Sequence, residues 1–131
     1  MVTTITIQDE TMMQGVTHEF VLAFFTEQIT VRDLISRRVQ EEVEQYNSQR
    51  PEKFIGLIRP SHLEEQLNGA RQRQYRPINL GKQIALAEEA FMSNGFLLLV
   101  GKQQLTELDE VIELRPDTTV SFLKLVPLVG G

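Results

Sequence analysis

The residues best suited to take part in a reaction are the last two, Gly130 and Gly131, which follow an extended apolar run. Glycine has no Cβ, so a terminal pair of glycines adopts backbone angles closed to other residues and can thread a channel that excludes side chains. The Gly131 carboxylate can then reach a nucleotide buried in a partner enzyme. The alternative is a frayed tail or a cloning remnant, and the segment in front of the glycines argues against it.

That segment has the pattern of a buried strand that ends where a tail begins. Residues 118–125 are rich in β-branched and apolar side chains, as buried strands are. Pro127 cannot donate a hydrogen bond to a sheet, so we expect the strand to stop before it. A flexible tail is predicted over residues 127–131.

The composition indicates a single folded domain over residues 1–131. Hydrophobic residues make up 41% of the chain and charged residues 24%, which is typical of a globular protein able to bury a core. A net charge of -5 argues against a general nucleic-acid surface. The chain has no cysteine, which excludes disulfides, thiolate metal sites and a thiol nucleophile, so any thioester must form on a partner's cysteine.

The sequence lacks the patterns of an export signal and of a membrane-spanning segment. The first residues show no basic segment followed by a long apolar core, and no run approaches 18 apolar residues. We therefore expect a cytoplasmic protein with no membrane partner.

Periodicity predicts two strands and a helix in the first third of the chain. Val2–Gln8 alternates between apolar and polar residues, Asp9–Thr17 is predicted to be a hairpin loop, and His18–Phe25 resumes a strand that pairs antiparallel with the first. Thr30 with Asp33 forms a variant of the capping box, so a helix should begin after Thr30. Its apolar stripe should face the sheet. The opposite face is predicted to be solvated and consists of Arg32, Arg37, Arg38, Gln40, Glu41, Glu44 and Gln45.

Residues 47–95 are interpreted as an insert that carries a second helix. Prolines interrupt residues 47–78, which we expect to be an irregular surface elaboration that the core does not require, with a short helix between Ser61 and Gly69. The spacing of apolar residues predicts a longer helix over Asn79–Ser93 that joins the core. A cationic cluster in the insert is interpreted as a solvated loop, with contact to an acidic partner as the alternative; it consists of Arg71, Arg73 and Arg76.

The last third of the chain is predicted to be β-structure. Phe96–Val100 is an apolar run of strand length, Gly101-Lys102 has the pattern of a tight turn, and Gln103–Leu105 is predicted to pair back as a second hairpin. The order is strand, strand, helix, insert with a helix, then three strands. The chain is therefore predicted to be α+β.

This layout, with a diglycine after the last strand, resembles the β-grasp or ubiquitin-like fold, in which one helix packs across a mixed sheet. The ending is similar to that of the small sulfur-carrier subunit of molybdopterin synthase. The residues that carry the similarity are Asp109-Glu110-Val111-Ile112, Asp117-Thr118-Thr119-Val120-Ser121-Phe122 and Val126-Pro127-Leu128-Val129-Gly130-Gly131. The chain is longer than family sulfur carriers because of the insert, and it is also similar to bacterial ubiquitin-like modifiers.

The resemblance implies that Gly131, with Gly130, is the site of activation and that the apolar tail binds a partner through Val126, Pro127, Leu128 and Val129. A partner activating enzyme would use ATP and Mg²⁺ to adenylate the carboxylate, and this chain would bind no cofactor of its own. The product would be an isopeptide bond to a target protein, in some systems through a conjugating enzyme, or a thiocarboxylate in a sulfur carrier. A non-conjugated adaptor is the third alternative.

No catalytic residue or metal ligand is predicted within the chain. His18 and His62 have no recognisable partner spacing and are interpreted as ordinary strand or surface residues. Neighbouring acids on helices do not converge on one point, so they do not form an acid–base pair; they are Glu41-Glu42, Glu64-Glu65 and Glu88-Glu89.

Overall fold

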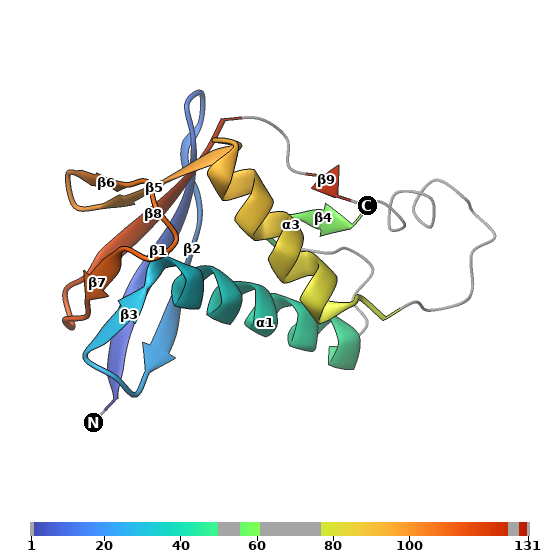
Figure 1. The fold of residues 1–131 in the computed structure, drawn as a ribbon, viewed down its shortest axis with the longest axis horizontal. Helices are drawn as coiled ribbons and strands as arrows, with labels where there is room; N and C mark the ends of the chain where they lie inside the picture. The colour runs from blue at the N-terminus through green and yellow to red at the C-terminus, as the bar shows by residue number, and fades with distance from the viewer. Residues whose placement is uncertain (1, 50–55, 61–76, 126–128, 131) are drawn as a thin grey trace.

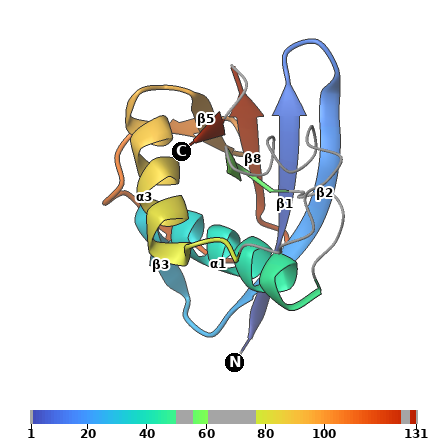
Figure 2. The same cartoon turned by 90° about the vertical axis from the view of Figure 1, so that its right-hand side faces the viewer.

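The computed structural model describes residues 2–49, 56–60, 77–125 and 129–130. Its architecture is α+β: a mixed five-stranded sheet carries two helices on one face (Figure 1), and both helices lie in front of the sheet when the molecule is turned (Figure 2). The strands, in their order across the sheet, are β2 (Gly15–Phe24), β1 (Thr3–Thr11), β8 (Thr119–Lys124), β5 (Phe96–Val100) and β6 (Gln103–Leu105). The helices are α1 (Val31–Gln49) and α3 (Leu80–Met92).

Two short two-stranded sheets accompany the main sheet, and the sequence pattern predicts neither. They are β3 (Gln28–Thr30) with β7 (Val111–Glu113), which are antiparallel, and β4 (Arg59–Pro60) with β9 (Val129–Gly130), which are parallel. Strands of two or three residues show too little alternation to be recognised.

Of the strands in the main sheet, the last along the chain, β8, lies in the middle. β8 runs parallel to β1, from the pair Thr6–Thr119 to the pair Thr11–Lys124, and antiparallel to β5 on its other edge. The chain therefore leaves β8 at the end of the sheet where β1 also finishes. This strand order is compatible with a β-grasp-like arrangement.

The first hairpin is longer than predicted. β1 continues to Thr11 and β2 begins at Gly15, whose φ of 67° lies in the left-handed region that favours glycine, so the predicted loop over Asp9–Thr17 is wrong. The strand register shifts between Asp9 and Glu10. Asp9 therefore lies within β1, and its side chain is buried.

The helix boundaries follow the predicted capping. The Thr30 hydroxyl accepts a hydrogen bond from the Asp33 backbone N–H, and the Asp33 carboxylate accepts one from the Thr30 N–H, both at 3.1 Å. Asn79 caps α3 by accepting from the Lys82 N–H at 2.8 Å. Both predicted long helices, and the hairpin formed by β5 and β6, are confirmed.

The core lies between the sheet and the helices, and part of the predicted surface insert belongs to it. Leu57, Ile58 and Ile78 are at most 4% exposed. The Asn47 side chain accepts from the Ile78 N–H at 2.8 Å and donates to the Ile78 C=O at 3.1 Å. The expectation that the core does not require residues 47–78 is therefore wrong for these positions. The predicted helix after Ser61 and the arginine cluster 71–76 lie outside the described residues.

Replacing Leu57 with alanine should lower the free energy of unfolding by about 2–5 kcal/mol, because it removes a side chain that is only 2% exposed. Met92→Ala is the control, since Met92 is 62% exposed and its truncation should change stability by less than about 0.5 kcal/mol. Urea denaturation of both variants makes the comparison. If both variants lower the free energy of unfolding by an equally small amount, residues 56–58 do not contribute to the stability of the core.

Candidate functional site

The predicted site residues fall partly within the described structure. Val129 and Gly130 form β9, whose backbone pairs with β4 through Arg59–Val129 and Pro60–Gly130 (Figure 1). Gly131 and residues 126–128 (Val126, Pro127 and Leu128) lie outside the described residues. The described end of the predicted tail is thus placed against the segment that precedes the second helix.

The point where the tail leaves the sheet is well defined. β8 ends at Lys124, and the Leu125 N–H donates a hydrogen bond to the Gly95 C=O at 3.0 Å. The strand therefore stops before Pro127, which confirms the boundary predicted from the inability of proline to donate to a ladder.

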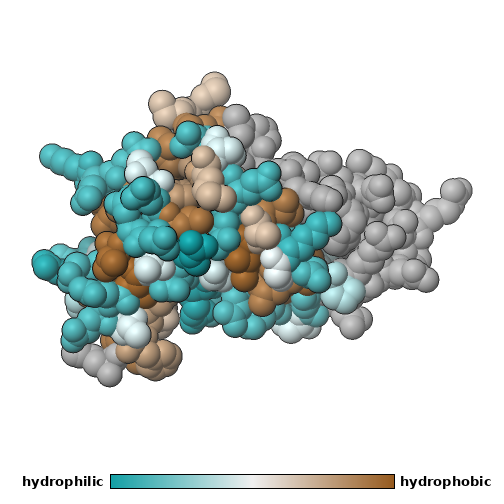
Figure 3. Space-filling view, viewed as in Figure 1, coloured by the Kyte–Doolittle hydropathy of each residue, from teal (hydrophilic) through white to brown (hydrophobic). Residues whose placement is uncertain are grey.

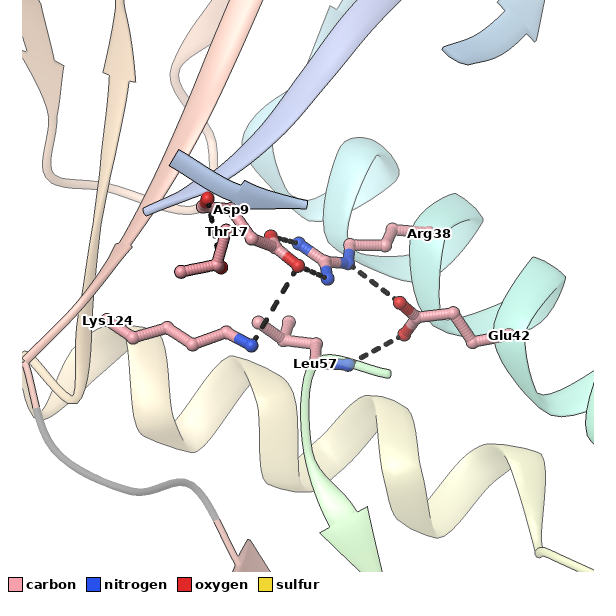
Figure 4. A network of polar contacts seen from close by, with 6 residues as sticks. All are labelled: Asp9, Thr17, Arg38, Glu42, Leu57 and Lys124. Carbon is pink, nitrogen blue, oxygen red and sulfur yellow. Dashed lines mark hydrogen bonds and ion pairs between the residues drawn. The ribbon is translucent and has the colours of Figure 1, made fainter. Parts of the chain in front are cut away.

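A buried arginine lies near Lys124 and Leu125, the residues at which the tail leaves β8 and which are called here the root of the tail. Arg38, on α1, is fully buried, and its two terminal nitrogens donate to the two carboxylate oxygens of Asp9 at 2.5 and 2.7 Å (Figure 4). This is the bidentate geometry that makes arginine–carboxylate pairs strong and directional. The prediction that Arg38 belongs to the solvated face of the helix is wrong.

Two less buried charged side chains complete the group, which is called here the buried ionic cluster and consists of Asp9, Arg38, Glu42 and Lys124. The side chains of Glu42 and Lys124 are 14% and 26% exposed. The Arg38 Nε donates to Glu42 at 3.1 Å, and the Lys124 Nζ lies 3.8 Å from the Asp9 carboxylate (Figure 4). Two cations thus face two anions, which offsets the cost of removing them from water. The other carboxylate oxygen of Glu42 accepts the Leu57 N–H at 2.9 Å.

Aromatic rings enclose the guanidinium. The Arg38 Cζ lies 4.4 Å from the ring centroid of Phe122 and 5.1 Å from that of Phe20. At these distances the ring faces attract the cation. The arginine is therefore held by carboxylates in the plane of its nitrogens and by rings nearby.

Burial changes the proton affinity of this cluster. Burial raises the pKa of Glu42 above its ordinary value of 4.5, against the opposing effects of the Arg38 charge and the Leu57 hydrogen bond. Burial alone would lower the pKa of Arg38, but Glu42 and Asp9 together raise it above its ordinary value. Arg38 therefore stays charged, and burial favours the protonated form of Glu42.

The sequence does contain a signal for this cluster. Asp9 is the next inward position of β1 after Ile5 and Ile7, by the alternation of a strand. Arg38 follows Leu34 by four residues, so it lies on the buried stripe of α1. A charge at an inward position of each of two elements indicates a buried ion pair.

The cluster joins α1 to β1 and β8, and through Glu42 to the segment before β4. The carboxylates of Asp9 and Glu42 both accept charge-assisted hydrogen bonds from Arg38. Exposed His18 lies in β2 with its ring beside Phe20 and takes no part in the cluster.

The neighbouring acids do not converge. Glu41 pairs with Arg37 while Glu42 pairs with Arg38, and Glu88 lies 3.6 Å from Arg32. His62 and Glu64-Glu65 lie outside the described residues. Among the residues that the structure describes, no three His, Asp or Glu side chains gather as metal ligands. Within the same residues, neither helix has the length and apolar character to cross a bilayer.

Two adjacent arginines offer a matched test of the cluster. Arg38→Met should lower the free energy of unfolding by about 3–5 kcal/mol, because it leaves buried carboxylates without their counter-charge. Arg37→Met removes a partly exposed pair with Glu41 and should cost under about 1 kcal/mol. Chemical denaturation provides both values, and equal costs would contradict the role of Arg38 in joining α1 to β1.

The raised pKa of Glu42 gives a pH dependence with a definite sign. The folded chain binds a proton at Glu42 more tightly than the unfolded chain does, so the stability that Glu42 contributes is greatest below its ordinary pKa of 4.5 and falls as the pH rises through the raised folded value. Glutamine does not titrate. The stability of the wild type relative to Glu42→Gln should therefore decrease as the pH is raised above about 4.5. Urea denaturation across this range measures the difference, and an increase with pH would contradict the burial of Glu42.

The chain was compared with protein-family models, with curated proteins and with solved structures, and no match was found. Its function is therefore inferred from its own fold, from the diglycine segment and from the buried ionic cluster.

Proposed function

We propose that the chain is a ubiquitin-like protein modifier, with a β-grasp fold, whose Gly131 carboxylate is adenylated by a partner enzyme and conjugated to an amine of a target protein. One observation carries the proposal: β8 is a central strand, paired on both edges, and the residues that follow it lead within a few positions to Gly130-Gly131. A rigid strand thus presents a narrow, side-chain-free end.

The proposed chemistry uses only the carboxylate of this chain. A carboxylate oxygen attacks the α-phosphorus of ATP, held with Mg²⁺ in the activating enzyme, and pyrophosphate leaves. A partner's cysteine thiolate then attacks the acyl carbon and expels AMP, which forms a thioester. Finally, the target amine displaces the thiol and forms an isopeptide bond. A bulky residue at position 130 or 131 would disturb the first step, because a misplacement of about 1 Å can cost 10²-fold in rate.

The surface around the root of the tail suits contact with a partner enzyme. Thr11 pairs with Lys124 at the end of the sheet, so the tip of the β1–β2 hairpin lies at the end from which the tail departs. Met12 and Met13 at this tip are 75% and 96% exposed, and apolar atoms project at the top of Figure 3. Exposed flexible thioethers are typical of adaptable contact surfaces. Leu125, 42% exposed, extends this apolar end.

Two alternatives share the same fold. In a sulfur carrier, the activated carboxyl group accepts sulfur and becomes a thiocarboxylate. In a non-conjugated adaptor, the diglycine has no reactive role and binding uses other surfaces. The modifier is preferred because the chain carries the core residues Leu57, Ile58 and Ile78 and the helix α3, which a minimal carrier of a sulfur atom does not need.

Deletion of Gly131 should abolish activation without affecting the fold. With a partner activating enzyme, ATP and Mg²⁺, the full chain should release pyrophosphate and form a thiol-sensitive adduct on that enzyme, whereas the truncated chain should do neither. Lys102→Ala, in the exposed β5–β6 turn, is the control and should behave as the wild type. Thermal unfolding of all three proteins should coincide.

Intact mass spectrometry distinguishes the outcomes. It first establishes that Gly131 ends the mature chain. Replacement of the terminal oxygen by sulfur would select the sulfur-carrier route, and a mass corresponding to the chain joined to a target peptide would support the modifier. Pyrophosphate release that is as fast without Gly131 as with it would refute both and leave the adaptor.

A further inference from the structure

We infer that β4 is a docking strand for the chain's own C-terminal segment, and that the Val129–Gly130 pair with β4 must separate before a partner can bind the diglycine. The docking itself is a property of the isolated chain. Only its effect on activation depends on the function proposed above.

Two polar side chains, one from each helix, hold the segment before β4 in place. Glu42 on α1 accepts the Leu57 N–H at 2.9 Å, and Gln83 on α3, itself 4% exposed, donates to the Ile58 C=O at 2.8 Å. The side chains of Leu57 and Ile58 are buried. Arg59 follows directly, so the helices fix where β4 begins.

The root of the tail is held by the same cluster. The Lys124 Nζ lies 3.8 Å from the Asp9 carboxylate, and Arg38 links Asp9 to Glu42. The Leu125 N–H donates a hydrogen bond to the Gly95 C=O. From Leu125 to Val129 the chain spans four residue steps, at most about 14 Å when fully extended. A tether this short keeps the diglycine near β4 at an effective concentration on the order of mM.

The docked pair is short enough to be reversible. It joins two residues of each strand, Arg59–Val129 and Pro60–Gly130, and Pro60 has no N–H to donate. A partner that binds the extended tail therefore competes with β4. Its apparent affinity for the tail is the intrinsic affinity multiplied by the fraction of molecules in which the tail is free, so docking on β4 weakens binding.

Disulfide trapping tests the docking directly, because the chain has no cysteine of its own. The double variant Arg59→Cys/Val129→Cys places thiols on paired residues, where Cα separations fall in the range that disulfides bridge. The control, Val2→Cys/Val129→Cys, keeps the same tail substitution and moves the second thiol to the N-terminal end, far from β9 in both views. Under mild oxidation the first should form an intramolecular disulfide at least about tenfold faster.

A second pair of variants tests the support of β4 without touching either docked segment. Gln83→Met, introduced into the trapping variant, removes the donor to Ile58 and should slow disulfide formation. Gln40→Met makes the same substitution at an exposed glutamine of α1 and should leave the rate unchanged. Trapping no faster in Arg59→Cys/Val129→Cys than in its control would overturn the docking, and a rate unaffected by Gln83→Met would overturn the role of Gln83 in fixing β4.

The effect on activation is measured on the same molecules. The oxidised trapping variant should be adenylated at least about tenfold more slowly than its reduced form, and a reductant should restore the rate. Equal rates would overturn the requirement for release. If the reduced form and the wild type are both inert toward the activating enzyme, the proposed function fails, while the trapping rates still decide the docking.

Discussion

The paired charges of Arg38 and Asp9 are the interaction on which the arrangement of this molecule depends. A guanidinium removed from water costs several kcal/mol unless carboxylates and hydrogen bonds compensate it. Here Asp9 binds it with both oxygens, Glu42 binds the Nε, and the ring of Phe122 lies 4.4 Å away. Because the buried guanidinium of Arg38 needs both carboxylate oxygens of Asp9, the two-point contact fixes the register of α1 along β1 as well as their separation.

The cluster also joins the two regions that concern function. Through Asp9 it reaches Lys124 at the end of β8, and through Glu42 it reaches Leu57, two residues before β4. The same cluster therefore contacts both the end of β8, where the tail begins, and the segment before β4, the strand that pairs with the tail. Because only a few residues separate β8 from β9, the two residue pairs between β4 and β9 can hold β9 in place even though so short a pairing is weak on its own.

Local patterns predicted the parts of this fold that are determined locally. The Thr30–Asp33 capping box, the α3 helix and the β5–β6 hairpin follow from spacing and turn chemistry over a few residues. The sequence pattern predicts Asp9 in a hairpin loop and Arg38 on the solvated face of a helix, whereas their contact in the structure joins positions 29 residues apart. Leu57 and Ile58 show no period, and their burial depends on hydrogen bonds from two helices that the sequence does not reveal. The reactivity of Gly131 stays a prediction from the sequence.

Residue-resolved amide hydrogen exchange tests the central claim, that the buried ionic cluster fixes the segment before β4 to the core. The comparison is between the wild type and Glu42→Met, which removes the acceptor of the Leu57 N–H and keeps an apolar side chain of similar length. The account predicts that the Leu57 amide loses its protection, while Ile7 in the central strand β1 remains protected. Unchanged protection at Leu57, or an equal loss at Ile7, would contradict it.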